Sequence, residues 1–395
     1  MRRYIAVIVL NCSVFIFMGG VGMIVALLPQ RIITLSGSIS QVGYLASAFA
    51  VSYVLFQLPI GRLADLLGFT RFLIGGYLLC ACTGVLYYFA DTALTIFIGR
   101  ILQGLGEAPI WALAPALLSL HYPADKGKMI GLYNASIHLG LTAGSLLGIQ
   151  LSQIWQGNEA FLVFAGGSFL GGIGVLYFLE NPCQASVGAK TLKVDYSQLS
   201  ALITTREPLI VFVGILLYGA GYGIFLTMIP AFLIHVKQVG QTGIGLFFTL
   251  FYVAISLSQL IAGPFTDRMG SKFPMISGML IAAMGIAAFA WFPQPWCYGL
   301  LTAASFGLGV FCVASMSFLN ERVSNALKGT ISGAFYVFWG IGFFLFPLVL
   351  GYINAKGKSV EGFWILSSLF FVEALILAYM QRKKVKEAIK IETSC

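Results

Sequence analysis

Twelve stretches of the chain are apolar for long enough to cross a lipid bilayer as helices. A helix needs roughly 20 apolar residues to span the hydrocarbon core, and each stretch has about that length. They cover residues 4–28, 39–60, 70–90, 93–120, 128–152, 160–180, 208–235, 242–265, 273–292, 296–319, 329–353 and 360–380. The pattern predicts an all-α integral membrane protein with twelve transmembrane helices.

A long polar stretch divides these helices into two sets of six. It covers residues 181–207, between the sixth and seventh apolar runs. We therefore expect an N-terminal six-helix bundle (1–180), a cytoplasmic central loop (181–207), a C-terminal six-helix bundle (208–380) and a basic cytoplasmic tail (381–395).

The two sets of helices repeat one another when the numbering is shifted by 202 residues, as from Asp65 to Asp267. The same shift superposes Gly43 on Gly245, Phe49 on Phe251, Gln57 on Gln259, Gly61 on Gly263, Gly68 on Gly270, Gly127 on Gly329, Gly131 on Gly333 and Gly140 on Gly342. One register that holds from the second helix to the fifth indicates a duplicated six-helix unit. Such a duplication predicts two pseudo-symmetric bundles with a transport site near the membrane midplane between them.

Composition and charge agree with a multi-pass membrane protein. Hydrophobic residues make up 59 % of the 395 residues and charged residues 9 %, whereas a soluble domain has roughly 25 % charged residues. With a cytoplasmic N-terminus, 18 of the 23 Lys and Arg residues fall on the cytoplasmic side and four on the other. This split predicts a plasma (inner) membrane protein with both termini in the cytoplasm. The net charge of +9 is spread over short loops and the tail, so no nucleic-acid partner is expected.

The sequence contains none of the motifs that would indicate an enzyme, a metal site or direct use of ATP. The seven cysteines form no CxxC pair or His/Cys cluster, and the three histidines lie in no catalytic set. No GxxxxGK[ST] motif occurs, so an ion gradient rather than ATP is expected to drive any transport. We therefore expect no enzyme activity, no cofactor and no metal, with a small-molecule substrate, the proton and the lipid bilayer as partners.

The fourth predicted helix carries a row of polar residues within an apolar run: Arg100, Gln103 and Glu107. Seven residues are nearly two helical turns, so the guanidinium and the carboxylate share one face about 10 Å apart. A charge at the centre of a membrane helix costs roughly 2.5–3.5 kcal/mol, which favours a position facing protein or a wet cavity. This face is predicted to line a substrate or proton path; a static buried pair that fixes the helix is the alternative.

Two further helices have polar or aromatic side chains at helical spacing. Asn134 and His138 begin a stripe on the fifth helix that continues to Thr142 and Ser145. A histidine at this depth can change charge near neutral pH and so contact a proton or an anion; a hydrogen-bonded structural histidine is equally consistent. On the seventh helix Tyr218, Tyr222 and Phe225 are candidates to line the C-terminal half of the cavity, with packing or an aromatic interface belt as the alternative.

Two loop motifs in equivalent positions resemble a signature of the major facilitator superfamily. They are GRLADLLGFTR from Gly61 and GPFTDRMGSK from Gly263, and the family signature is G-x3-D-(R/K)-x-G-(R/K)-(R/K). The fourth-helix R-x-x-Q-G signature of the same family appears at Arg100. The resemblance covers essentially the whole chain and implies transport by alternating access.

This resemblance also implies that the loop motifs latch the two halves when the cytoplasmic gate is shut. The motif residues are Gly61, Asp65, Gly68, Arg71, Gly263, Asp267, Arg268 and Gly270. Physically, we expect the glycines at each end to permit a tight turn and the aspartate to lie near a helix N-terminus. The first copy has Leu66 and Thr70 where basic residues are usual. The alternative is that the motif serves only the turn and the topology.

Branches of the superfamily suggest two directions of transport. The stretch GLTAGSLLG on the fifth helix resembles the antiporter signature of exporters, although Ser145 replaces its proline and Ile149 its last glycine. The R-x6-E-A stretch resembles organic-anion:cation symporters and spinster-like transporters, which implies a proton-coupling role for Glu107. The predicted function is proton-coupled efflux of a small organic compound; the alternative is proton-coupled uptake of an organic anion. Glu373, in the last helix, is expected at the bundle edge or near a headgroup.

Overall fold

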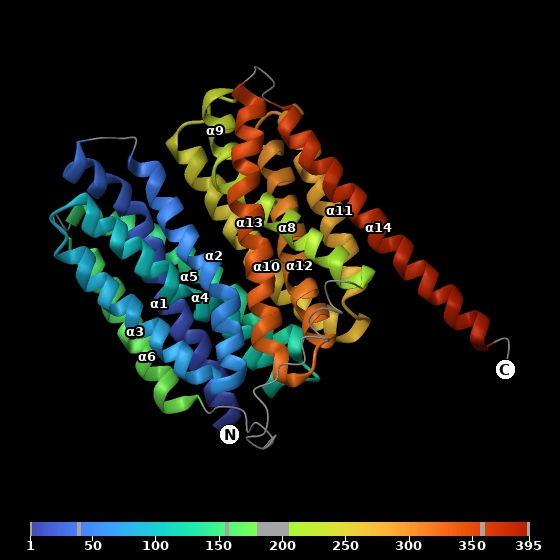
Figure 1. The fold of residues 1–395 in the computed structure, drawn as a ribbon. Helices are drawn as coiled ribbons and strands as arrows, with labels where there is room; N and C mark the ends of the chain where they lie inside the picture. The colour runs from blue at the N-terminus through green and yellow to red at the C-terminus, as the bar shows by residue number, and fades with distance from the viewer. Residues whose placement is uncertain (1, 38–40, 155–157, 180–204, 356–359, 393–395) are drawn as a thin grey trace. The chain divides into compact units, whose positions relative to one another are not determined.

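The computed structural model describes residues 2–37, 41–154, 158–179, 205–355 and 360–392, and these residues are helical almost throughout. The first half contains α1 (Arg2–Ser36), α2 (Gln41–Leu67), α3 (Phe69–Tyr88), α4 (Ala93–His121), α5 (Lys126–Ile154) and α6 (Glu159–Phe178). The second half contains α8 (Arg206–Leu226), α9 (Met228–His235), α10 (Gln241–Met269), α11 (Lys272–Ala288), α12 (Trp296–Glu321), α13 (Lys328–Ala355) and α14 (Glu361–Glu392). Two short 3-10 helices, η1 (Phe289–Trp291) and η2 (Asn325–Leu327), complete the described elements. The predicted all-α membrane fold is confirmed (Figure 1).

Eleven spans in the described part of the chain are long and apolar enough to cross a membrane. One of them combines α8 and α9 into a single span, Arg206–His235. The twelfth predicted span corresponds to α5, which is 29 residues long but is not among the eleven. Asn134, His138 and several small residues lower the hydropathy of this helix. Most of the predicted central loop lies outside the described residues, while the predicted tail continues α14 to Glu392.

The chain forms two compact units, and each contains a short segment from the other half of the sequence. Unit 1 consists of Met1–Pro123, Leu132–Ala189 and Val323–Val337. Unit 2 consists of Ala124–Gly131, Lys190–Arg322 and Phe338–Cys395. The first turns of α13 therefore belong to unit 1 and the first turns of α5 to unit 2.

Equivalent helices pack in the same pairs within each unit. In unit 1, α4 packs against α2 and α3, and α3 packs against α6. In unit 2, α12 packs against α10 and α11, and α11 packs against α14. These are the pairs related by the 202-residue shift, so the internal repeat seen in the sequence is also a repeat of helix packing.

Glycines on α5 allow this helix to lie directly against the backbone of α1. A Cβ atom added to Gly144 would collide with the carbonyl group of Gly19, and one added to Gly140 would meet the carbonyl oxygen of Phe15 at 2.5 Å. In lipid, where packing rather than hydrophobicity drives helix association, small residues permit this close approach. The contact accounts for these glycines without any antiporter role.

We predict that Gly144→Ala destabilises the protein by about 1–3 kcal/mol, because the added methyl group overpacks the α1–α5 contact. Gly75→Ala is the matched control, since Gly75 is exposed on α3 with no atom within 4 Å of an added Cβ. Alanine is the better helix former, so the control is expected to be neutral or slightly stabilising. Thermal unfolding in detergent compares the two variants; equal stability would contradict the packing interpretation.

Candidate functional site

The polar row predicted on the fourth helix is a continuous chain of hydrogen bonds on α4. Arg100 Nη1 donates to Gln103 Oε1 at 2.9 Å, and Gln103 Nε2 donates to Glu107 Oε1 at 2.8 Å. Residues three and four apart on a helix are neighbours on its surface, which is why these side chains reach one another. Arg100 and Glu107 make no direct ion pair, so the expected pair is replaced by a bridge through Gln103.

The row is buried inside unit 1, against α2 and α3. Arg100 is 8 % exposed, Gln103 0 % and Glu107 2 %. Arg100 Nε donates to the carbonyl oxygen of Leu45 at 3.1 Å, and its guanidinium lies 4.6 Å from the ring centre of Phe49. The cation is thus stabilised by a carbonyl group and an aromatic face of α2 as well as by Gln103.

Tyr87 of α3 fixes the orientation of the bridging amide. Its hydroxyl donates to Gln103 Oε1 at 2.9 Å, so this oxygen accepts two hydrogen bonds, one from Arg100 and one from Tyr87. A reversed amide would present its NH₂ group to the guanidinium, which can only donate. Gln103 is therefore held with its NH₂ group directed at Glu107.

Trp111 connects the row with the polar stripe of α5. Its indole Nε1 donates to Glu107 Oε2 at 3.1 Å, and its ring makes edge contacts with His138 and Tyr336 at centroid distances of 6.4 and 5.9 Å. Trp111 is half-buried, whereas His138 is 2 % exposed. One indole ring thus contacts both residues predicted for proton coupling.

One ring nitrogen of His138 is hydrogen-bonded to the backbone of its own helix. His138 Nδ1 lies 2.7 Å from the carbonyl oxygen of Asn134. Because a carbonyl oxygen only accepts, Nδ1 carries the hydrogen of this bond. The side chain of Asn134 is buried beside it, and its Nδ2 has no hydrogen-bond partner among the described residues.

The three aromatic residues predicted on the seventh helix are packed inside unit 2. Phe225 stacks on Phe251 and Phe247, with ring centres 4.9 and 6.0 Å apart. Tyr222 makes an edge contact with Phe251, with ring centres 5.2 Å apart. The ring centre of Tyr218 lies 6.3 Å from those of Phe311 and Tyr222. All three are at most 5 % exposed, so they lie in the interior rather than in an interface belt.

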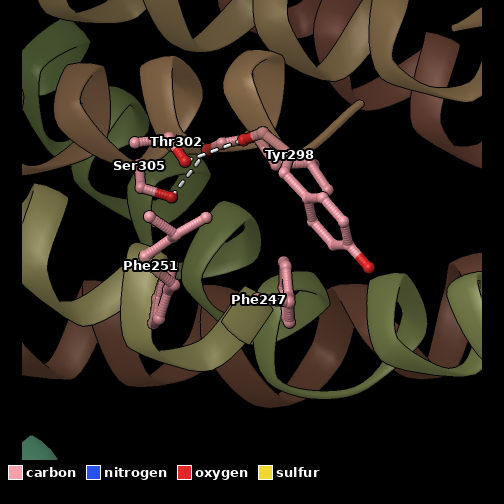
Figure 2. A pocket seen from close by; sticks show the side chains of 7 residues that line it. Phe247, Phe251, Tyr298, Thr302 and Ser305 are labelled. Atoms are coloured by element: carbon pink, nitrogen blue, oxygen red, sulfur yellow. Dashed lines mark hydrogen bonds between the residues drawn. The ribbon is translucent and has the colours of Figure 1, made fainter. Parts of the chain in front are cut away.

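Phe247 and Phe251 also form one wall of a small pocket in unit 2. The empty space here, including the part open to solvent, is about 140 Å³, and Tyr298, Thr302 and Ser305 of α12 lie on its other side. Figure 2 shows these side chains around the pocket and the bonds that the two hydroxyls donate to backbone carbonyl oxygens one turn earlier, each at 2.7 Å. Phe225 is not among the residues that line this pocket, but it stacks on two rings that do.

The aspartates of the two loop motifs each hold the first turn of a helix from the other repeat. Asp65 accepts bonds from the backbone N–H groups of Gly329 and Thr330, both at 2.7 Å. Asp267 accepts from the N–H groups of Gly127 and Lys128 at 2.7 and 2.8 Å. Carboxylates at a helix N-terminus satisfy free N–H groups and are favoured by the helix dipole. Each aspartate thus lies at a helix N-terminus, Asp65 at that of α13 and Asp267 at that of α5.

The motif glycines have two different roles. Gly68 and Gly270 end their helices with φ of 96° and 78°, which allows the expected turn. Gly61 and Gly263 instead lie inside α2 and α10. A Cβ on Gly61 would collide with the carbonyl oxygen of Gly329, so the first glycine of the motif permits helix contact and not a turn.

The basic residues of the motifs do not share one role either. Arg71 and Arg268 are exposed. Lys272 donates to Glu207 at 3.2 Å, and the second carboxylate oxygen of Glu207 binds Arg322 at 2.8 Å. Lys126 pairs with Glu321 at 2.9 Å. All three ion pairs lie in unit 2, and only Lys126 comes from the first repeat.

Comparison with known families identifies the chain. The family model of the Major Facilitator Superfamily matches residues 10–347 and 211–394. The chain belongs to this superfamily. It is therefore a multi-pass membrane protein and a secondary transporter that works by alternating access, and it is not an enzyme.

Individual superfamily members differ in what their names say they transport. The tetracycline resistance protein, class H, of Pasteurella multocida is 23 % identical over 389 residues, which cover 95 % of this chain and 96 % of that protein. The D-galactonate transporter of Escherichia coli is 24 % identical over 380 residues, which cover 86 % and 84 %. The structure of the human organic anion transporter MFSD10 superposes with a TM-score of 0.80 at 16 % identity, covering 95 % of this chain and 99 % of that one.

The sequence prediction did not include Tyr87 or Trp111 in the site of this transporter. Trp111 lies four residues after Glu107, so helical spacing alone places it on the same face. Nothing in the sequence links Tyr87 of α3 with Gln103 of α4, because that contact depends on how the two helices pack. The roles assigned to the site residues stay predictions.

We predict that Gln103→Leu destabilises the transporter, because it removes a partner from Arg100, Tyr87 and Glu107 at once. An unsatisfied buried polar group costs roughly 1–3 kcal/mol, so a loss of this size or larger is expected in thermal unfolding. Gln150→Leu on α5, where the glutamine is exposed, makes the same chemical change without breaking the row. The bridge has no structural importance if the two variants unfold alike.

Proposed function

We propose that this transporter exports a small organic compound in exchange for protons, with Glu107 as the proton-coupling group. The observation that carries the proposal is the buried row from Arg100 through Gln103 to Glu107. Ionisable groups inside membrane helices are costly and mark substrate or proton pathways. Moving one charge through 100 mV supplies about 2.3 kcal/mol, enough to bias substrate movement more than tenfold.

The hydrogen bonds around Glu107 fit its ionised form. Both carboxylate oxygens accept, one from Gln103 and the other from the Trp111 indole. A protonated carboxyl group must donate from one oxygen, and both neighbours are themselves donors. Gln103 cannot reverse, because Arg100 and Tyr87 hold its oxygen. Proton arrival therefore displaces the half-buried Trp111.

This displacement gives the proton a way to act on the rest of the transporter. The ring of Trp111 contacts His138 on α5 and Tyr336 on α13. A shift of the indole changes the packing of both helices, whose first turns are held by Asp267 and Asp65. Loading Glu107 with a proton would then favour release of these cytoplasmic latches. In this proposal His138, on the far side of the Trp111 contact, passes the proton.

Proton-coupled uptake of an organic anion is the second candidate, because the D-galactonate transporter is as similar to this chain as the tetracycline resistance protein, at 24 % and 23 % identity. This mechanism needs Arg100 to bind the anion. Two of its nitrogens already donate within the protein, and the side chain is 8 % exposed. These contacts favour a role for Arg100 in supporting Glu107, and with it export.

We predict that Glu107→Gln abolishes transport driven by a pH gradient but preserves substrate exchange, since an amide cannot release a proton. Tetracycline and D-galactonate are the first probes in proteoliposomes with an internal pH dye. Glu159→Gln, an exposed carboxylate at the start of α6, is the matched control. Proton-dependent transport that survives in Glu107→Gln would exclude the coupling role.

The same assay distinguishes the two directions. Proton and substrate moving in opposite directions support export. Co-directional movement, with D-galactonate counterflow lost in Arg100→Ala, would establish the anion-uptake alternative instead.

We further propose that Asp65 and Asp267 latch the cytoplasmic gate, and predict that Asp65→Asn loosens the start of α13. Loss of hydrogen bonds to a charged group costs about 1.5–3 kcal/mol, so amide hydrogen exchange at Gly329 and Thr330 is expected to accelerate about tenfold or more. Asp267→Asn should act in the same way on Gly127 and Lys128. Asp91→Asn, at an exposed loop position, is the control. Unchanged exchange in both latch variants would rule out the latch.

A further inference from the structure

Glu373 is a buried acid on α14 that the proposed coupling through Glu107 does not use. It is 3 % exposed and belongs to the inward stripe of α14 with Phe370 and Ala374, which are 0 % and 1 % exposed. Its neighbours Val372 and Leu375 are about half exposed, at 50 % and 52 %. The expected position at the bundle edge is therefore wrong, because the carboxyl group faces the interior of unit 2.

The carboxyl group lies against α8 and α12. A Cβ atom added to Gly214 of α8 would lie 2.9 Å from Glu373 Oε1 and 2.7 Å from the ring of Phe311. Glu373 Oε1 accepts no hydrogen bond from the described residues. The missing side chain at Gly214 thus creates the space that the acid occupies.

Charged groups on the surrounding helices lie at the helix ends. Those on α8, α11 and α12 are Arg206, Glu207, Lys272 and Glu321, and those on α14 besides Glu373 are Glu361 at its start and the charged residues from Arg382 onward. The titratable groups of α8 and α12 nearest in sequence to Gly214 and Phe311 are Tyr218 and Cys312. Gly214 lies eight residues beyond Arg206, or about 12 Å along the helix. An unpaired carboxylate at this depth would cost several kcal/mol. These surroundings favour the neutral acid over the carboxylate.

A pocket between the same four helices has lining residues one helical turn from this acid. It contains about 260 Å³ of space including its open mouth, where Glu207 and Lys272 are paired. Val211 and Leu377 form part of its apolar wall. Val211 lies three residues before Gly214 on α8, and Leu377 lies four residues after Glu373 on α14. Each separation is about one helical turn, or about 5 Å.

We propose that Glu373 is a proton-binding site of unit 2 that exchanges protons with the cytoplasm through this pocket. A proton from water in the pocket adds to a carboxylate oxygen to form the neutral acid, and the reverse step returns it to water. The path passes the Leu377 side chain, which must move for water to reach the acid. The site stands independently of Glu107, since no step requires the Arg100 row.

Infrared spectroscopy of the full-length protein in liposomes tests the proposal directly. A protonated carboxyl group has a carbonyl band that a carboxylate lacks, so acid-minus-alkaline difference spectra should contain such a band from Glu373. The band should disappear in Glu373→Gln and remain in Glu107→Gln. An unchanged band in Glu373→Gln at every pH would overturn the proposal.

A second measurement identifies the protonated residue and does not require a variant to fold. Dicyclohexylcarbodiimide reacts with protonated carboxyl groups in apolar surroundings, with the acid proton moving to a carbodiimide nitrogen as the carbon–oxygen bond forms. Peptide mass spectrometry of the wild-type protein should find the adduct on Glu373, decreasing as pH rises, and none on the ion-paired Glu207. Glu373 unlabelled at every pH would overturn the site.

The route is tested by filling the pocket. Leu377→Trp should slow the infrared response of the Glu373 band to a pH jump several-fold, because the larger side chain closes the last turn before the acid. Ile376→Trp, on the lipid-facing side of α14 where Ile376 is 38 % exposed, should leave the rate unchanged. Equal rates in the two variants would overturn entry through the pocket.

Discussion

Buried polar groups at membrane depth must find their partners within the protein, and this constraint shapes the described structure. In hydrocarbon no water is available to satisfy a lone donor or a charge. Arg100 is therefore placed between a carbonyl oxygen, an aromatic ring and Gln103, and both oxygens of Glu107 accept hydrogen bonds. A bridge of one neutral amide keeps the two charges on one helix without direct contact.

The same constraint acts at the first turns of α5 and α13. Free N–H groups at a helix start need acceptors, and Asp267 and Asp65 supply them from the repeat that does not contain the helix. The contact requires the helix backbones to lie close together, which Gly61 with Gly329 and Gly263 with Gly127 allow. The same contact therefore occurs twice, at equivalent positions of the two repeats. Each consists of one aspartate that holds a helix start and one pair of glycines that lets the helix backbones approach.

Glu373 departs from this constraint in a way that gives it a functional meaning. Glu107 accepts from two donors, whereas no donor among the residues that the structure describes reaches Glu373 Oε1. Desolvation acts on both acids, but only the first has neighbours that stabilise its charge. Two buried acids in different surroundings are suited to different protonation states, which gives the transporter one carboxyl group that fits the ionised form and one that fits the neutral acid.

The sequence by itself determined the spans, the internal repeat and the polar face of α4, because hydrophobic length and helical spacing are local properties of the chain. It also identified Asp65, Asp267 and His138 as residues of interest. Tertiary structure decided what these residues contact: Tyr87 reaches Gln103 only because α3 packs on α4, and Asp65 binds the start of α13 from 264 residues away along the chain. It likewise decided that Glu373 faces inward, since the missing side chain at Gly214 makes room for it only when α8 and α14 are packed. Contacts between distant helices depend on shape complementarity across the fold, and no local pattern in the sequence records that.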